Sequence, residues 1–171
     1  MPLPINQDEK TPVRLPPETF RMVVELTPLV SIDFVVRDAG RNILVGYRRN
    51  RPARGYWFVP GGRLGKNETR VDAFRRLSRV ELGVELEPAR DSFLGVYEHM
   101  YPDNFSGDPG FGTHYVVLAY EIPVVEAARL RLPADQHEGY LWLSEAEMLR
   151  RDDVHEYSKA YCAVRPRGGS Q

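Results

Sequence analysis

The residues with the clearest chemical potential lie between positions 55 and 86. In GYWFVPGGRLGKNETRVDAFRRLSRVELGVEL, the pair Gly61 and Gly62 follows an apolar run and precedes a segment that mixes acidic and basic side chains. Glycine lacks a Cβ atom, so the backbone at such a pair can come close to a ligand or a metal ion. The stretch therefore predicts a strand, a Gly-Gly turn and a charged helix arranged around a binding site.

Arginine dominates the basic residues, with 20 Arg against 3 Lys. Four of these arginines, Arg48, Arg49, Arg51 and Arg54, lie in RRNRPARGYW just before the Gly-Gly pair. Codon bias is the simplest source of the excess, whereas a ligand with phosphates or carboxylates would use the bidentate hydrogen bonding of arginine. The net charge of -1 at pH 7 excludes a global basic field, so we expect no nucleic-acid partner.

Two further residues combine titratable chemistry with a notable position. His137 follows Asp135 and Gln136 in a predicted loop. A free imidazole has a pKa of about 6.5 and can accept a proton at neutral pH, although a loop histidine is more often an ordinary surface residue. Asp33 lies within the apolar run LVSIDFVVRD. An unpaired charge is costly there, so we expect Asp33 to have a partner or a ligand.

Hydrophobic periodicity and the positions of Gly and Pro place these residues on alternating elements. The predicted elements are a short helix from Pro16-Pro17 to Leu26, strands at 29–38, 43–49 and 56–60, a helix over 68–82 with Asn67 and Gly83 as caps, strands at 92–99 and 113–122, the apolar segment YLWLS, and helices near 144–150 and 153–164. The irregular alternation predicts an α/β (α+β) class with a mixed sheet between helices.

Length and composition suit one soluble domain. The 171 residues, 42% of them hydrophobic, predict a flexible arm over 1–15 and a single domain over 16–171. Cys162 is the only cysteine, which excludes an intramolecular disulfide and favours a reducing compartment. No stretch reaches the ~20 apolar residues that span a bilayer, and the first ten residues lack a secretory pattern. We therefore expect a cytoplasmic protein with no membrane partner.

The segment after the Gly-Gly pair resembles the Nudix box, which is Gly, five residues, Glu, seven residues, Arg-Glu, an apolar residue, any residue, Glu-Glu, any residue, Gly and an apolar residue. The matching positions are Gly62, Glu68, Arg76, Glu81, Gly83 and Val84. Leu77 and Val80 replace two glutamates of the box, and Ser78 replaces its apolar residue. The resemblance implies that Glu68 and Arg76 pair to brace the segment and that Glu81 is the one carboxylate left in the metal-binding cluster.

These losses are similar to those of the GDP-mannose mannosyl hydrolases, a branch of the Nudix superfamily. The resemblance extends from Thr27 to Arg165 through TPLVSIDFVV, NRPARGYWFVPGGR, AFRRLSRVELGV, HMYPDNFSGD, THYVVL, LPADQHEGYLWL and DDVHEYSKAY. The loop at 106–113 and the N-terminal arm are longer than expected for that branch. The resemblance implies a Nudix fold, a homodimer, and hydrolysis of GDP-mannose or a close GDP-sugar to GDP and free sugar, through water attack on the anomeric carbon with inversion.

The resemblance also implies roles for individual residues. These are His137 as general base, Arg48 and Arg63 at the departing diphosphate, Asp33, His99 and Tyr115 at the substrate, and the Gly61 carbonyl, Glu81 and Gln136 as ligands of Mg²⁺ or Mn²⁺. Oxygen ligands that include a carboxylate suit these cations. A nucleoside diphosphate is a good leaving group when its charge is stabilised, so a general acid is not required. Arg49, Arg51 and Arg54 are expected to be solvated or structural.

Two other functions remain open at this point. A conventional Nudix pyrophosphohydrolase would split the diphosphate into a nucleoside monophosphate and a sugar phosphate, but the missing carboxylates at Leu77 and Val80 argue against it. A non-catalytic Nudix domain that binds nucleotide sugars would not need a base beside its metal. The combination of Glu81, Gln136 and His137 argues against that function.

Overall fold

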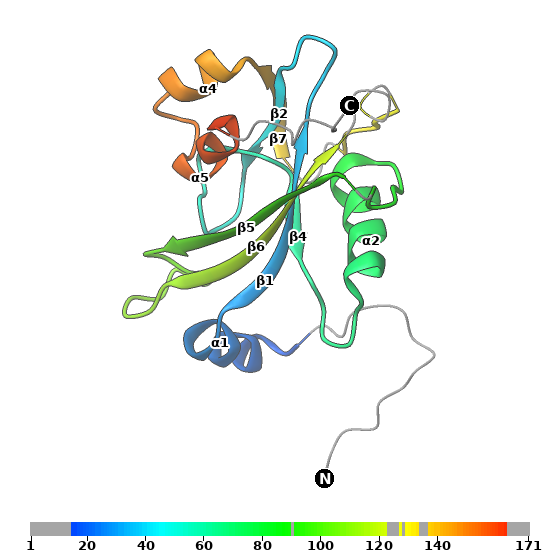
Figure 1. Cartoon of the computed structure of the whole chain (residues 1–171). Coiled ribbons are helices and arrows are strands. Elements are labelled where there is room, and N and C mark those ends of the chain that lie inside the picture. Colours follow the sequence, from blue (N-terminus) through cyan, green and yellow to red (C-terminus); the bar gives the residue numbers. More distant parts are fainter. Residues whose placement is uncertain (1–14, 90, 123–126, 128, 134–136, 164–171) are drawn as a thin grey trace.

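The computed structural model describes residues 15–89, 91–122, 127, 129–133 and 137–163. In this part of the chain, strands form two sheets and helices lie on both sides of them (Figure 1). The elements are α1 (Pro17–Leu26), β1 (Leu29–Val36), β2 (Ile43–Arg48), β3 (Trp57–Phe58), β4 (Gly61–Arg63), α2 (Arg70–Leu82), β5 (Phe93–Tyr101), β6 (Thr113–Ile122), β7 (His137–Leu143), α4 (Glu145–Arg150), α5 (Glu156–Lys159) and the 3₁₀ helix η1 (Ala160–Ala163). The predicted class is confirmed. None of the helices described here has the length and apolar character needed to span a membrane.

β1 is the central strand of the fold. The larger sheet has the order β4-β1-β6-β5, in which β1 and β6 are parallel and the other pairs are antiparallel. The smaller sheet, β3-β2-β7, is antiparallel. The sequence LVSIDFVV is rich in β-branched residues, as expected for a strand that is covered on both faces. Because side chains alternate along a strand, Ile32 and Phe34 face one side while Ser31, Asp33 and Val35 face the other.

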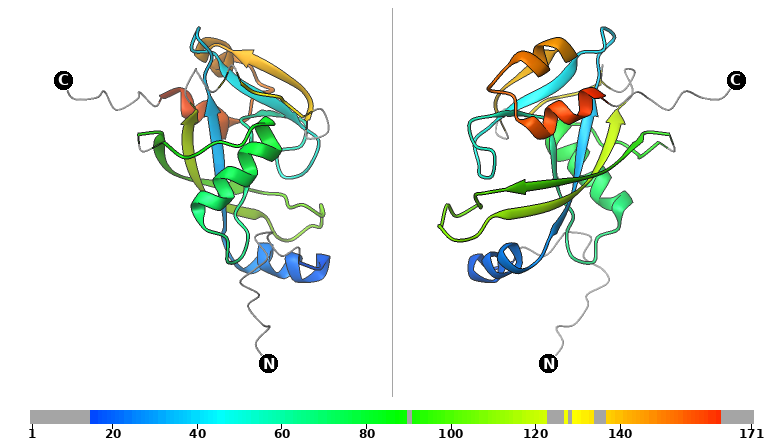
Figure 2. Two further views of the ribbon diagram at one scale, coloured as in Figure 1. Left: turned by 90° about the vertical axis from the view of Figure 1, so that its right-hand side faces the viewer. Right: turned by 60° about the vertical axis from the view of Figure 1, so that its left-hand side comes forward.

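Each face of β1 has its own hydrophobic cluster. Phe34 packs in one cluster with Leu77 and other residues of α2. Val35 packs in the second cluster, to which the C-terminal segment contributes Tyr161. The two views in Figure 2 show α2 and the C-terminal helices on opposite sides of the sheets. Asp33 therefore faces the side that the C-terminal segment covers.

The ends of α2 follow from local capping chemistry. Its N-cap is Thr69, whose Oγ1 accepts a hydrogen bond from the Asp72 N–H at 3.2 Å. The prediction of Asn67 as the cap is wrong, because this residue adopts a φ of 64° in the preceding turn. Gly83 ends the helix in the left-handed conformation with a φ of 69°, as predicted.

The residues that depart from the Nudix box have defined places in the structure. Leu77 is buried, and its Cδ2 atom would lie 2.5 Å from a Cβ atom at position 62, so the packing requires Gly62. The buried Ser78 hydroxyl accepts a hydrogen bond from the Leu86 N–H at 2.9 Å. Val80 is 38% exposed. One lost carboxylate is thus replaced by a core residue and the other by a surface residue.

The predicted pair of Glu68 and Arg76 is confirmed. Arg76 donates through Nε and Nη2 to the two carboxylate oxygens of Glu68, at 2.6 and 2.8 Å. Glu68 also accepts the Gly65 N–H at 2.8 Å, and Arg76 donates to the Arg63 carbonyl at 2.9 Å. The Glu68 side chain is only 4% exposed. This network ties the loop after the Gly-Gly pair to α2.

Two segments that the sequence placed in a turn and a loop are strands. β4 begins at Gly61, which pairs with Asp33 of β1. His137 is the first residue of β7 and pairs with Arg48 at the end of β2, so the prediction of a loop at this histidine is wrong. Neither segment starts with the β-branched residues typical of strands, and pairing with a neighbour makes them extended. The predicted final helix is divided into α5 and η1.

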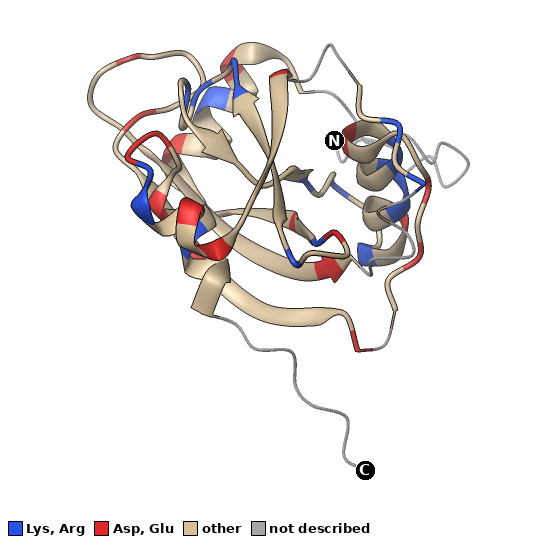
Figure 3. Cartoon of the chain, turned by 90° about the horizontal axis from the view of Figure 1, so that it is seen from above, with Lys and Arg blue, Asp and Glu red and all other residues tan. Residues whose placement is uncertain are grey.

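The arginines on the outer face of α2 pair locally. Arg75 contacts Glu87 at 2.5 Å and Asp72 at 3.3 Å, and Arg79 lies 3.3 Å from Glu85. Figure 3 shows acidic and basic positions interspersed over the described elements. The large number of arginines therefore does not turn α2 into a uniformly basic surface.

We predict that Glu68→Gln lowers the free energy of unfolding by about 2–4 kcal/mol, because it removes the buried anion that balances the Arg76 guanidinium. Urea denaturation followed by circular dichroism measures the loss. The matched control is Glu87→Gln, since Glu87 pairs with Arg75 on the same helix but has a side chain 64% exposed. The control should lose no more than about 1 kcal/mol. Equal losses would contradict the bracing role of Glu68.

Candidate active site

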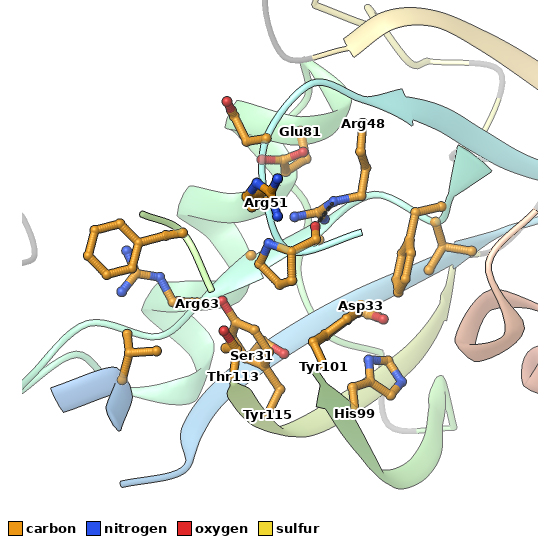
Figure 4. Close-up of a pocket in the computed structure, with 18 of the residues that line it drawn as sticks. Ser31, Asp33, Arg48, Arg51, Arg63, Glu81, His99, Tyr101, Thr113 and Tyr115 are labelled. Atoms are coloured by element: carbon orange, nitrogen blue, oxygen red, sulfur yellow. Dashed lines mark hydrogen bonds between the residues drawn. The ribbon is translucent and has the colours of Figure 1, made fainter. Parts of the chain in front are cut away.

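A cavity of about 380 Å³ opens on the face of β1 that carries Ser31 and Asp33. Figure 4 shows its side chains converging from several elements, with Arg63 at one end, Asp33 and His99 at the other, and Glu81 and Arg48 on the facing wall. A smaller hollow of about 100 Å³ adjoins it and is lined by Arg48, Arg49, Asn50, Gly61, Glu81 and His137. The two spaces share several residues and form one candidate site.

The predicted site residues within the described chain all line these spaces. Asp33, Arg63, His99 and Tyr115 line the cavity, His137 lines the hollow, and Arg48, Gly61 and Glu81 line both. The remaining predicted ligand, Gln136, lies outside the described residues. The fold thus brings the candidates to one place, while the chemical role of each remains a prediction.

Glu81 and His137 form the polar centre of the hollow. Glu81 Oε2 lies 3.5 Å from His137 Nε2, and the two side chains are 12% and 7% exposed. Among the described residues, neither ring nitrogen of His137 has a hydrogen-bond partner, and both are buried. The ring lies against Gly46, where a Cβ atom would approach it to 2.5 Å. Gly46 therefore leaves the space that the imidazole occupies beside Glu81.

The hollow has donor chemistry that fits a divalent cation. Within 4 Å, the ionic partner of the Glu81 carboxylate in the described chain is the His137 ring, and Gly61 lines the same space. No group of three or more His, Cys, Asp or Glu side chains that could hold a metal occurs among the described residues. Mg²⁺ commonly uses one or two carboxylates together with substrate phosphates and water. The site therefore suits a cation shared with a phosphorylated substrate.

Arg48 and Arg63 bring positive charge to the cavity. The Arg48 Nε donates to the Pro52 carbonyl at 3.1 Å, and its guanidinium lies 5.5 Å from the centre of the Phe58 ring. The Arg63 guanidinium lies 4.1 Å from the centre of the Phe20 ring. Contact with an aromatic face does not neutralise the cation. Both guanidinium groups therefore remain suited to binding phosphate oxygens.

Asp33 is a buried carboxyl group that has the partner expected from the sequence. The Tyr161 hydroxyl donates to Asp33 Oδ2 at 2.8 Å. Burial raises the pKa of Asp33 from 3.8 to about 7, and this effect outweighs the opposing effects of the Tyr161 hydrogen bond and the Arg48 charge. Asp33 can therefore hold or release a proton near neutral pH.

His99 is buried in its neutral form. Burial, with a smaller contribution from His155, lowers the pKa of His99 to about 4. Its ring stacks on Tyr157 with the centroids 4.2 Å apart and an angle of 1° between the planes. In the described chain, the buried Nε2 of His99 has no hydrogen-bond partner. A neutral imidazole that lines a cavity suits hydrogen bonding to the hydroxyl groups of a ligand.

Sequence reasoning missed most of the aromatic residues of the cavity. Phe20, Tyr101 and Phe105 line it, and the Phe20 and Phe105 rings lie 4.7 Å apart. Phe20 matched a core position of the predicted first helix, and an aromatic residue carries no signal that separates a core from a cavity wall. Arg51 was expected to be solvated or structural; it lines the cavity and contacts Asp103 at 3.0 Å.

The chain resembles known proteins in both sequence and fold. The family model of the NUDIX domain matches residues 27–164. The low-salt glycan biosynthesis protein Agl8 of Haloferax volcanii is 43% identical over 117 residues, which are 68% of this chain and 72% of that protein. A MutT NUDIX hydrolase from Burkholderia pseudomallei is 24% identical, with 80% of this chain and 96% of that chain covered and a TM-score of 0.60. A MutT protein from Methanosarcina mazei Go1 is 18% identical, with 80% and 92% covered and a TM-score of 0.59. The two structural likenesses concern the fold alone.

We predict that the free energy of unfolding of Asp33→Asn, taken relative to that of the wild type, rises by about 2–3 kcal/mol between pH 5 and pH 8. The pKa of Asp33 is about 7 in the folded protein, whereas an unfolded aspartate has a pKa of about 3.9. The unfolded chain therefore releases this proton first as the pH rises, which favours unfolding of the wild type. The asparagine variant has no such proton to release.

Urea denaturation of both proteins in metal-free buffer at the two pH values measures this difference. Asp152→Asn is the control, because Asp152 is exposed, and its effect on stability should be the same at both pH values. A wild type and an Asp33→Asn variant with parallel pH dependence would show that Asp33 is ionised in the folded protein as readily as in the unfolded chain.

Proposed function

Because the chain belongs to the NUDIX domain family and has the Nudix fold predicted from its sequence, we propose that it is a metal-dependent hydrolase of GDP-mannose or a closely related GDP-sugar. The products are GDP and the free sugar, and water attacks the anomeric carbon with inversion. The observation that carries this proposal is that α2 presents one box carboxylate, Glu81, to the hollow beside the buried ring of His137.

The geometry of α2 supports this bond specificity over cleavage of the diphosphate. Leu77 is part of the core and Val80 is exposed, so the hollow lacks the further carboxylates that the Nudix box normally supplies at these two positions. Fewer carboxylates balance fewer divalent cations. A site that holds less metal charge is better suited to stabilising a departing diphosphate than to activating water for attack on a phosphorus atom.

The chemistry of the cavity matches the three parts of a GDP-sugar. The aromatic pair of Phe20 and Phe105 offers flat apolar surface for a base. Arg48 and Arg63 offer positive charge to the diphosphate. Asp33 would repel a phosphate when ionised, but together with the neutral His99 it suits the hydroxyl groups of a sugar. A base, a diphosphate and a sugar can therefore be placed along the cavity with each part next to compatible groups.

The reaction follows from what these residues can do. When bound, a divalent cation at Glu81 and Gly61 would compensate the charge of the diphosphate. Arg48 stabilises the electron pair that passes to the phosphate oxygen as the C–O bond of the sugar breaks. Water forms the new bond to the anomeric carbon and loses a proton to the His137 imidazole. The resulting imidazolium is stabilised by Glu81 Oε2, which lies 3.5 Å away.

The relative from Haloferax volcanii is named for glycan biosynthesis. Such a process would use nucleotide sugars, which are also the class of substrate proposed here. The homodimer and the assignment of Gln136 as a metal ligand remain predictions from the resemblance, and the cytoplasmic location remains a prediction from the sequence pattern.

We predict that turnover of GDP-mannose with Mg²⁺ in heavy-oxygen water places the label in the free sugar, because the water oxygen bonds to the anomeric carbon. Mass spectrometry of the separated products measures this. Label in a phosphate product would instead support a conventional Nudix pyrophosphohydrolase. The absence of turnover across GDP-mannose, GDP-glucose and GDP-fucose would support a binding domain without catalytic activity.

We predict that His137→Gln lowers kcat by ~10²–10⁴-fold while the affinity for GDP changes little, since the variant loses a proton acceptor but keeps the charged residues of the site. Steady-state kinetics and GDP inhibition measure the two quantities. His114→Gln is the matched control, because His114 lies on β6 outside the lining of the cavity. An unchanged kcat for His137→Gln would remove this residue from the mechanism.

A further inference from the structure

The C-terminal segment contacts two lining residues of the cavity, Asp33 and His99, through two tyrosines. Tyr161 of η1 is fully buried, and its hydroxyl bonds Asp33. Tyr157 of α5 stacks on His99. Asp33 and His99 belong to different strands of the larger sheet, and the two residues that contact them lie one helical turn apart in the sequence. A single short segment therefore contacts both polar groups at this end of the cavity.

Tyr161 restricts the orientation of the Asp33 carboxyl group. Its hydroxyl donates a hydrogen bond to Oδ2 at 2.8 Å. The other oxygen, Oδ1, faces Gly61, and a Cβ atom at position 61 would lie 2.6 Å from this oxygen. The backbone of Tyr161 is itself held, because its carbonyl accepts a hydrogen bond from Arg37 Nη2 at 3.3 Å. Arg37 is only 1% exposed and also pairs with Glu145 at 2.8 Å. The hydroxyl that contacts Asp33 therefore extends from an anchored segment.

Tyr157 restricts the plane of the His99 ring. The Tyr157 hydroxyl accepts the Met100 N–H at 2.8 Å and donates to the Met100 carbonyl at 2.7 Å. These two bonds fix the phenol next to β5, and the His99 ring lies parallel to it. The ring of Tyr161 is also near, with its centroid 6.4 Å from that of His99. Rotation of the imidazole would break the stack.

We propose that Tyr157 and Tyr161 are positioning residues that orient His99 and Asp33 and thereby determine which sugar the enzyme accepts. The proposal rests on the function proposed above. Sugars such as mannose and glucose differ in the direction of one hydroxyl group, so discrimination requires hydrogen-bonding groups held in fixed directions. The nucleotide part of the substrate would contact Arg48, Arg63 and the aromatic pair of Phe20 and Phe105, rather than the residues that the two tyrosines hold. Sugar selectivity and GDP affinity should therefore respond independently.

The test uses Tyr161→Phe, which keeps the buried ring and removes the hydroxyl. We expect kcat/KM for GDP-mannose to fall by ~10–100-fold, as for the loss of a hydrogen bond to a buried ionisable group. The ratio of kcat/KM between GDP-mannose and GDP-glucose should move toward one. The inhibition constant of GDP should stay within about twofold of the wild type, which a general distortion of the site would not allow. The matched control is Tyr97→Phe, because the Tyr97 ring packs on Tyr161 at 4.9 Å but does not line the cavity.

Tyr157 is tested with two variants. Tyr157→Leu removes the stack and should reduce the sugar selectivity about as strongly as Tyr161→Phe. Tyr157→Phe keeps the ring over His99 and should retain more of the selectivity than the leucine variant. Thermal unfolding of each variant establishes that the assays use folded protein.

The results separate this inference from the proposed function. If the wild type hydrolyses GDP-sugars at the anomeric carbon but the Tyr161→Phe and Tyr157→Leu variants keep its selectivity, the inference is wrong and the function stands. A parallel loss of GDP affinity and kcat/KM would also overturn the inference, since it indicates a structural role. If the wild type hydrolyses no GDP-sugar, the proposed function itself fails and the inference fails with it.

Discussion

The packing of α2 against β4 is the constraint on which the candidate site depends. Leu77 fills the space that the absent side chain of Gly62 leaves, and the pair of Glu68 and Arg76 ties the intervening loop to the same helix. The far end of α2, which carries Glu81, is therefore held in register with the larger sheet. Because protein interiors are close-packed, a shift of this helix would be transmitted to its end. The position of Glu81 thus depends in part on contacts made about one helical turn away.

The site concentrates titratable groups in surroundings that oppose their charge. Asp33 is shifted toward its protonated form and His99 toward its neutral form, in both cases mainly by burial. Groups with shifted pKa values cluster at functional sites, where the chemistry that they provide compensates for the loss of folding stability. The C-terminal segment limits the cost, since Tyr161 satisfies one oxygen of Asp33 while its own ring is part of the hydrophobic cluster.

The scaffold and the chemistry of this chain can be separated. The Nudix fold supplies the sheets, α2 and the Gly-Gly turn, and a fold by itself does not set a reaction. The reaction depends on which side chains the scaffold presents. Here α2 contributes core residues and one carboxylate to the site, while β2, β4, β5, β6 and β7 supply two arginines, two histidines and two tyrosines around it. The site therefore has fewer carboxylates to bind metal ions, relative to its hydrogen-bonding groups, than a site whose helix keeps the full set of carboxylates.

Local sequence determined the features that depend on near neighbours. The apolar run of β1 and the helix that ends at Gly83 follow from periodicity and capping, whereas the pair of Glu68 and Arg76 was predicted from the family resemblance. The resemblance to a known family placed the candidate residues, and the fold then gathered those within the described chain around one cavity. Tertiary structure alone decided that β4 and the start of β7 are extended, because pairing with distant strands overrides weak local preference. It also decided the partner of Asp33 and the aromatic walls, since burial and contact between residues far apart in the chain cannot be deduced from residue type.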